Sequence, residues 1–245
     1  MKPINLAAAI GARRASRPAN RAQPKHRDGW YRIANSSDGT TATVSIYDEI
    51  GYWGTTASQF CDELAALDVT SIDVRINSPG GDVFDGCAIY NALLNHPADV
   101  TTYNDGLSAS IASVIFQAGN LRVVARASQT MIHKPSALCI GCDEDMIACA
   151  TLLGSVGTMI ASVYADGAGG GAPMWLAAMS NETWYSAEET VAAGLADAVQ
   201  GQAAVVEDAF DLSVFNYAGR AAAPAPPVLN WDPDAFRRAM KEAVL

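Results

Sequence analysis

The stretch SIDVRINSPGGDVFDGCAIYNALLNHPADVTTY (residues 71–103) predicts a strand, a helix and a second strand in succession. Ser71–Ile76 alternates apolar and polar residues as a half-buried strand does, and Asn77–Asp82 is a turn rich in Gly and Pro. Val83–Asn95 has the apolar spacing of a helix, and Val100–Tyr103 is again strand-like. This order predicts an α/β fold with a mainly parallel sheet and helical crossovers.

The residues upstream extend the same sheet. Trp30–Ile50 predicts a hairpin, because Ser36–Gly39 is turn-like and Thr41–Tyr47 is β-branched and alternating. Thr56–Leu67 predicts a helix, since its apolar residues recur on one helical face.

Downstream, Met146–Ala165 is a run of 20 residues without a charge, which is long enough to cross a bilayer. Its Thr, Ser and Gly residues and its acidic flanks, Asp143–Asp145 and Asp166, disfavour a membrane span. A helix that is apolar around its circumference is otherwise buried on all sides. We therefore expect residues 146–165 to form the interface of a homo-oligomer and expect no membrane contact.

The rest of the chain gives the domain boundaries. Pro173–Met179 and Ser186–Gly194 are predicted helices, the second with a capping box, and a closing strand follows. We expect one domain over residues 29–215. An Ala/Pro-rich linker over 216–230 and an amphipathic helix over 231–245 complete the predicted organisation.

Charge separates the N-terminal arm, residues 1–28, from the body. Seven Lys or Arg and no acid lie within residues 1–27; the remaining chain holds nine basic and 26 acidic residues, a net charge of −17. The body should repel nucleic acid, which excludes it as the main partner. The basic, Pro-containing arm is predicted to be disordered. It does not resemble a secretory signal, whereas an organelle transit peptide stays open.

The five cysteines do not suggest a disulfide framework and favour a reducing compartment. The spacing of Cys139 and Cys142 invites a zinc or redox interpretation, but a second pair or a neighbouring histidine is missing from the sequence. We expect both to be structural, with no metal and no cofactor.

The chemistry concentrates in Asn104–Pro135, where Ser110 ends a small-residue turn (Gly106–Ser110) before an apolar helix and His133 ends a strand-like segment. Residues 23 positions apart meet only through the fold, as a hydrolytic dyad requires. Ser108 and Ser113 compete with Ser110, and each is expected to be structural. The other two histidines, His26 and His96, are expected to be solvated. Ser78–Gly81 is either an ordinary turn or an oxyanion hole.

Four motifs in order resemble the proteolytic subunit of the Clp protease. They are NSPGGDVFDGCAIYNAL (77–93), GLSASIASVIFQAG (106–119), MIHKP (131–135) and WYSAEETVAAGLAD (184–197). The chain is most similar to the phage members, the Clp-like head maturation (prohead) proteases, from about Thr43 to Val199. The resemblance implies a Clp/crotonase-like fold of repeated β-β-α units with a protruding helical handle.

The resemblance also implies the roles of the site residues. Ser110 corresponds to the nucleophile and His133 to its base, and Gly80, Gly81 and the N–H of Ile111 correspond to the oxyanion hole.

The family's third triad residue, an aspartate, falls on Glu182 here. Glutamate orients an imidazole from a longer side chain, and neighbouring Asn181 is an alternative without charge. Asp197 is expected to be structural. The resemblance places Pro135–Cys142 as a strand beside the cleft, with substrate binding at Pro135, Ser136 and Ala137.

The implied function is an ATP-independent serine endopeptidase that cleaves scaffold and capsid proteins, and itself, in the host cytoplasm and the phage procapsid. The sequence has no GxxxxGK[ST] nucleotide-binding loop. Two alternatives stay open. One is a non-catalytic capsid-assembly protein that retains the fold, and the other is a crotonase-type acyl-CoA enzyme.

Overall fold

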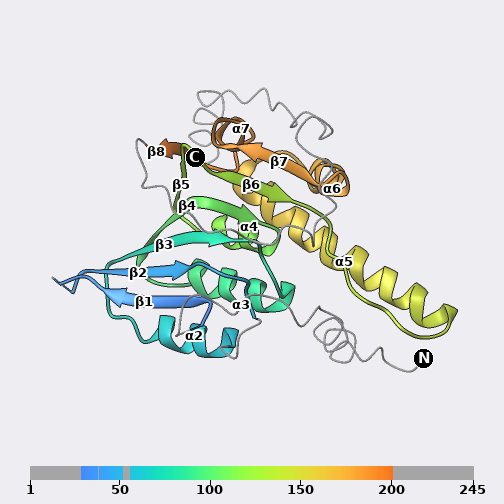
Figure 1. Cartoon of the computed structure of the whole chain (residues 1–245), viewed down its shortest axis with the longest axis horizontal. Helices are drawn as coiled ribbons and strands as arrows, with labels where there is room; N and C mark the ends of the chain where they lie inside the picture. The colour runs from blue at the N-terminus through green and yellow to red at the C-terminus, as the bar shows by residue number, and fades with distance from the viewer. Residues whose placement is uncertain (1–28, 38, 52–55, 201–245) are drawn as a thin grey trace, which may run out of the picture.

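The computed structural model describes residues 29–37, 39–51 and 56–200 (Figure 1). The predicted arm (1–28), linker (216–230) and terminal helix (231–245) lie outside the described residues, as does the end of the predicted 29–215 domain.

The described chain is built on one mixed sheet whose main path is β1-β2-β3-β4-β5-β8. The predicted hairpin is confirmed, because β1 and β2 pair antiparallel, and every later pair on this path is parallel. The smaller strands β6 and β7 lie off the path: β6 pairs parallel with β4, and β7 pairs antiparallel with β6. The strands are β1 (Tyr31–Asn35), β2 (Thr41–Ile46), β3 (Ser71–Ser78), β4 (Asp99–Ala109), β5 (Leu121–Ala125), β6 (Gln129–Ile132), β7 (Thr183–Ser186) and β8 (Ala198–Gln200).

Three of the helices, α2, α3 and α7, begin at a side chain that caps their first turn. The hydroxyl of Thr56 caps α2, the carboxylate of Asp82 caps α3, and Ser186 forms the predicted capping box with Glu189 at α7. The helices are α2 (Ala57–Ala65), α3 (Val83–Leu94), α4 (Ile111–Phe116), α5 (Asp143–Ala168), α6 (Ala172–Ser180) and α7 (Ala187–Ala192).

The core explains the alternation in the strands. Every second residue of β2 and β3 is fully buried, and these side chains join those of α2 and α3 in one cluster. At the other end, Trp175 of α6 and Tyr164 of α5 pack with ring centroids 5.7 Å apart. The core therefore continues from the hairpin to the base of the long helix α5 (Figure 1).

Two predictions about local structure are wrong. Within the predicted turn Gly106–Ser110, residues Gly106–Ala109 are instead the end of β4, which pairs with β3 on one side and β6 on the other. Small residues fit such a doubly flanked strand. Pro135–Ile140, within the predicted strand 135–142, belongs to no strand or helix, because no described strand lies beside it to form a ladder.

The long helix α5 is more exposed than its composition suggested. Its buried residues are Cys149 and, in its second half, Val156, Gly157, Ile160, Ala161, Tyr164 and Ala168. Its first half projects from the body (Figure 1), and Ile147 is 66% exposed. By length and composition alone, the helix is long and apolar enough to cross a membrane. Within this chain, 28% of an apolar 18-residue stretch of the helix is buried. Burial on all sides is thus not reached within this chain.

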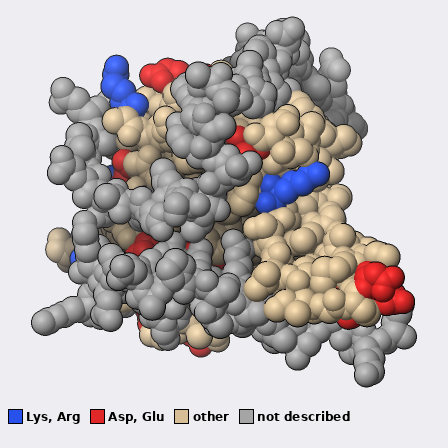
Figure 2. Space-filling model, turned by 45° about the vertical axis from the view of Figure 1, so that its right-hand side comes forward, with Lys and Arg blue, Asp and Glu red and all other residues tan. Residues whose placement is uncertain are grey.

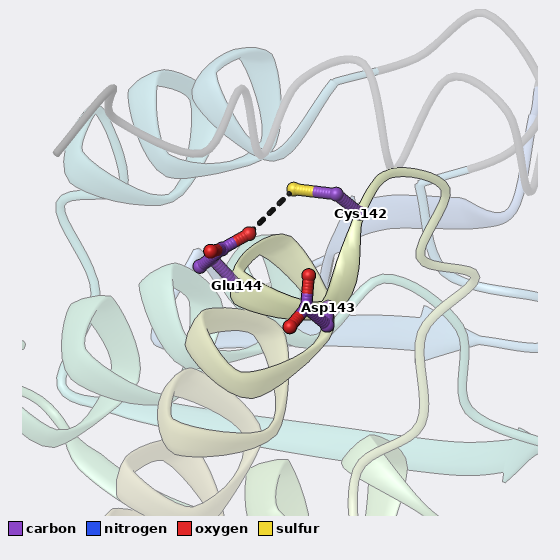
Figure 3. A group of neighbouring side chains, drawn as sticks. All are labelled: Cys142, Asp143 and Glu144. Carbon is purple, nitrogen blue, oxygen red and sulfur yellow. Dashed lines mark hydrogen bonds between the residues drawn. The ribbon is translucent and has the colours of Figure 1, made fainter.

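Acidic side chains gather at the outer end of α5 (Figure 2). Cys142, Asp143 and Glu144 are the one group in the described part of the chain whose side chains lie close enough to share a metal ion, and all three are exposed (Figure 3). The Cys142 thiol donates to the carboxylates of Glu144 and Asp145, which lowers the pKa of both. Asp145 also accepts the amide of Cys142 in a capping box. These contacts explain the group as the start of a helix.

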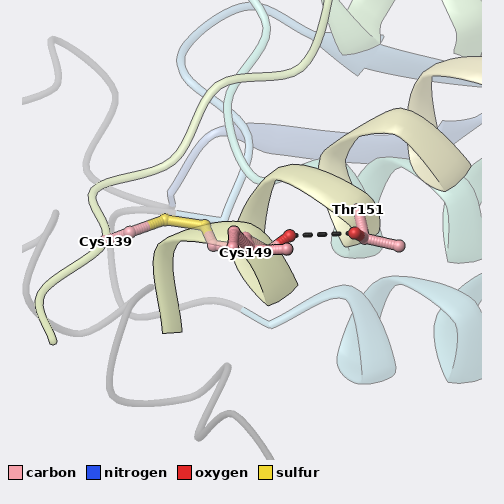
Figure 4. The surroundings of a disulfide bond; sticks show 4 residues. Cys139, Cys149 and Thr151 are labelled. Atoms are coloured by element: carbon pink, nitrogen blue, oxygen red, sulfur yellow. Dashed lines mark hydrogen bonds between the residues drawn. A yellow bond between two sulfur atoms is a disulfide. The ribbon is translucent and has the colours of Figure 1, made fainter. Parts of the chain in front are cut away.

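The cysteine predictions need correction. Cys139 forms a disulfide with Cys149, ten residues along the chain, and this bond ties the loop after His133 to α5 (Figure 4). Cys142 is a free, exposed thiol. The expectation of a chain without disulfides is wrong here because α5 turns Cys149 back toward the loop, which spacing in the sequence does not reveal.

Candidate active site

Ser110 and His133 meet because the strands that precede them are neighbours. Ser110 follows the last residue of β4, and His133 follows the last residue of β6. The two strands pair in parallel with Ala109 opposite Met131, so their carboxyl ends lie at the same sheet edge. The amide of Ser110 donates to the Met131 carbonyl at 2.9 Å. Ser110 Oγ then lies 2.7 Å from His133 Nε2, the contact of a nucleophile with its general base.

The backbone of Ser110 adopts a conformation that is rare for a residue with a side chain. Its φ is 57° and its ψ −129°, in the turn between β4 and α4. Gly80 lies directly against this turn: a Cβ there would be 2.7 Å from Ser110 Cβ and 2.8 Å from the Ala109 carbonyl oxygen. The motif therefore needs glycine at position 80 to leave room for the nucleophile.

The two glycines of the SPGG turn differ in what their amides do. The Gly80 N–H donates to Ser78 Oγ at 3.1 Å. The Gly81 N–H donates to no acceptor among the described residues. Ile111 is the first residue of α4, and amides in a first helical turn lack intrahelical partners. The predicted oxyanion hole thus has two amides without acceptors in the described part of the chain, those of Gly81 and Ile111, while Gly80 provides space.

Glu182 lies at the same end of the β6–β7 ladder as the histidine. The last pair of this ladder is Ile132 with Thr183, so His133 follows it on one strand and Glu182 precedes it on the other. Glu182 has a positive φ of 48°, and its Oε1 accepts from the indole of Trp184 at 3.3 Å. This neighbourhood agrees with a role in orienting His133, which stays a prediction.

The neighbouring Asn181 closes α6, and its amide donates to the Ala178 carbonyl. Its side chain as an uncharged alternative to Glu182 also stays a prediction. Asp197 is structural, as expected: its carboxylate forms a two-oxygen ion pair with Arg122 and accepts the Arg122 amide.

The competing serines are held inside the fold. Ser108 is fully buried in β4, and Ser113 Oγ donates to the Ser110 carbonyl. The expectation that His96 is solvated needs correction, because both of its ring nitrogens have backbone partners. Its Nδ1 accepts the Ala98 amide and its Nε2 lies 3.2 Å from the Leu64 carbonyl, so the ring fixes the turn after α3.

Sequence reasoning missed a charged cluster formed by β3, β4 and Tyr47, the residue that follows β2. Arg75 forms a two-point ion pair with Asp105, at 2.5 and 2.8 Å, and its guanidinium lies over the ring of Tyr103. The phenol of Tyr47 donates to the same carboxylate. Burial, followed by this hydrogen bond, raises the pKa of Tyr47 to about 12. The cluster anchors β4 five residues before Ser110, and its members are too far apart in sequence to form a motif.

Comparison with known proteins places this geometry in a family. The family model described as Clp protease matches residues 30–203. The chain is 29% identical to the ATP-dependent Clp protease proteolytic subunit 2 of Corynebacterium diphtheriae over 69% of its own length and 92% of that protein. It is also 29% identical to the proteolytic subunit 1 of Corynebacterium jeikeium, over 72% and 94%.

The fold is similar to that of a solved structure, a mutant ClpP1 from Listeria monocytogenes. The TM-score is 0.58 at 23% identity, and the likeness covers 67% of this chain and 93% of that one. With the family model matching most of the chain and with Ser110 and His133 in contact, the chain belongs to the Clp protease family and is a serine peptidase of the Clp type.

Proposed function

We propose that this protein is an ATP-independent serine endopeptidase that cleaves scaffold and capsid proteins, and its own terminal segments, during phage head maturation. The observation that carries the peptidase chemistry is the 2.7 Å contact between Ser110 Oγ and His133 Nε2. His133 takes the proton of Ser110 as the oxygen attacks the scissile carbonyl. The oxyanion is stabilised by the amides of Gly81 and Ile111. His133 then protonates the leaving amine, and water releases the acyl-enzyme.

The substrate would lie along the segment after His133. Pro135, Ser136 and Ala137 begin two residues after the base and belong to no strand or helix. An extended peptide can add to such a segment through backbone hydrogen bonds, which gives affinity with little demand on sequence. The scissile carbonyl would then lie between this segment and the Ser78–Gly81 turn.

The head-maturation assignment rests on the four motifs that resemble the phage members and on the parts of the chain outside the family match. Residues 1–29 and 204–245 lie beyond the matched region at either end. The arm is basic and the body acidic, so the arm is chemically distinct from the peptidase. We propose these terminal segments as sites of self-cleavage, and the host cytoplasm and the procapsid as the places of action.

Self-association is proposed through the exposed face of α5. The relatives are named proteolytic subunits, and Ile147, Met146 and Met159 on α5 are 66%, 38% and 42% exposed. Contact between these side chains and a second copy of the chain would remove apolar surface from water. The substitution Ile147→Glu should reduce the size of the assembly in light scattering. Leu94→Glu, which places the same charge on the exposed end of α3, should not; equal behaviour of the two variants would refute the interface.

The test of the function is co-expression with scaffold and capsid proteins, followed by mass spectrometry of all chains. The wild type should yield trimmed scaffold and trimmed termini of its own, and Ser110→Ala should yield neither. Ser180→Ala, at an exposed helical serine, is the matched control and should cleave normally. Cleavage by Ser110→Ala would refute the proposal.

The same experiment separates the other candidates. Intact scaffold in the wild type, with binding to capsid protein retained, would favour a non-catalytic assembly protein. Turnover of an acyl-CoA that does not depend on Ser110 would favour a crotonase-type enzyme. Cleavage only in the presence of an ATP-driven unfolding partner would favour a different peptidase function, that of the proteolytic subunit of an ATP-dependent protease. The names of the relatives suggest this function.

A further inference from the structure

A chain of two buried hydroxyls connects α5 to the nucleophile. Ser113 Oγ donates to the carbonyl oxygen of Ser110 at 2.5 Å, and the phenol oxygen of Tyr164 lies 2.8 Å from Ser113 Oγ. The single hydroxyl hydrogen of Ser113 is used on the carbonyl, so Tyr164 is the donor to Ser113. Burial raises the pKa of Tyr164 far above its ordinary value, so this donor keeps its proton throughout the working pH range.

This hydrogen-bond chain ends at the Ser110 carbonyl, which belongs to the same peptide group as the Ile111 N–H of the oxyanion hole. The Ser110 carbonyl and the Ile111 N–H belong to the same planar peptide, so bonds that fix the oxygen also fix the direction of the N–H. The amide of Ser113 donates to the same oxygen at 3.0 Å. Two donors on a carbonyl draw electron density from the amide nitrogen, which makes its N–H a stronger donor.

We propose that Tyr164 and Ser113 are positioning residues that orient and polarise the Ile111 amide for the oxyanion. The assignment rests on the proposed serine peptidase chemistry and extends it to α5, which does not itself contact the reacting atoms. The phenol is 51 residues away from Ser113 in sequence and is buried beside Trp175. The strained φ of Ser110 explains why its peptide needs such support.

The test uses full-length protein, a short peptide ester and a fluorophosphonate probe. Tyr164→Phe removes one oxygen and keeps the ring; it should lower kcat and the rate of Ser110 labelling roughly 3- to 10-fold with KM unchanged. Ser113→Ala should lower both about tenfold, less than the loss of an entire oxyanion donor. A peptide boronate should lose affinity in the same ratio as kcat/KM, whereas the product peptide should bind as before.

The double variant tests whether the two hydroxyls act in series. In a Ser113→Ala background, Tyr164→Phe should have no further effect on kcat, because its route to Ser110 is already broken. Thr102→Val is the matched control. Thr102 is fully buried, and its hydroxyl donates to the Phe116 carbonyl at 2.8 Å at the other end of α4. Its loss should lower thermal stability but leave kcat unchanged.

Several results would overturn the assignment. They are a Tyr164→Phe enzyme with kcat and labelling rate within twofold of wild type, additive effects in the double variant, and an equal loss of kcat in Thr102→Val. A wild type whose Ser110 is not labelled at all would overturn the peptidase function together with this assignment. A labelled wild type with an equally labelled Tyr164→Phe would overturn the assignment alone.

Discussion

The contact between Gly80 and the nucleophile turn leads to a sharp prediction for Gly80→Ala. The added methyl carbon would lie 2.7 Å from Ser110 Cβ and 2.8 Å from the Ala109 carbonyl oxygen. Favourable contacts between carbon atoms lie at about 3.5–4.0 Å. One side of the site must therefore move by roughly 1 Å. The φ of Gly80, 93°, adds strain for any residue with a side chain.

The backbone strain and the displacement of the nucleophile have different sizes, and stability and activity measurements distinguish them. The backbone strain should cost about 1–2 kcal/mol of folding free energy. A displacement of about 1 Å at the nucleophile should cost about 100-fold in kcat/KM. Stability should therefore fall modestly while activity nearly disappears.

The assay measures ester hydrolysis and thermal unfolding on Gly80→Ala beside Gly39→Ala. Gly39, in the hairpin turn, also has a positive φ, 70°, but no described heavy atom lies within 4 Å of the position that a Cβ would take there. Gly39→Ala should thus carry a similar strain and retain its activity. Activity of Gly80→Ala within threefold of wild type, or an equal loss in Gly39→Ala, would refute the reasoning.

Three further predictions concern stability. Asp197→Ala leaves Arg122, which is 9% exposed, without its ion pair and should cost about 2 kcal/mol, or roughly 4–8 °C in Tm, with kcat unchanged. Tyr47→Phe should flatten the loss of stability between pH 10 and about 12. The folded wild type holds the phenol proton there and the unfolded chain releases it, so the stabilisation is complete below pH 10 and lost as pH rises. Cys149→Ser should cost about 2.5 kcal/mol under oxidising conditions only, through the loss of its bond with Cys139.

Each of these has a direct measurement. Calorimetry and ester hydrolysis test Asp197→Ala, and a fall in kcat larger than twofold would contradict a purely structural role. Urea unfolding at pH 7, 10 and 11.5 tests Tyr47→Phe. An equal fall of the unfolding free energy with pH in variant and wild type would contradict the shifted pKa. Peptide mapping without reductant tests the disulfide, and alkylation of Cys139 in the oxidised protein would contradict it.

Sequence patterns predicted those parts of the fold that depend on local chemistry. The hairpin around Ser36–Gly39, the helix that Asp82 caps and the capping box of Ser186 with Glu189 all follow from side chains within a few positions. The contact of Ser110 with His133 was predicted from motif order and is present.

What could not be predicted depends on contacts between distant segments. Gly106–Ala109 has the composition of a turn and forms a strand because β3 and β6 flank it. The bond between Cys139 and Cys149 needs the loop to fold back on α5. The approach of Tyr164 to Ser113 likewise has no local signal, since packing of α5 against α4 creates it.

The central claim is that Ser110 is the nucleophile and His133 its base. The most direct measurement is mass spectrometric mapping of the fluorophosphonate adduct on the full-length protein. A single adduct on Ser110 that forms with the wild type and is lost in His133→Ala is the predicted result. An adduct on another serine, or labelling of Ser110 at the same rate without His133, would contradict it.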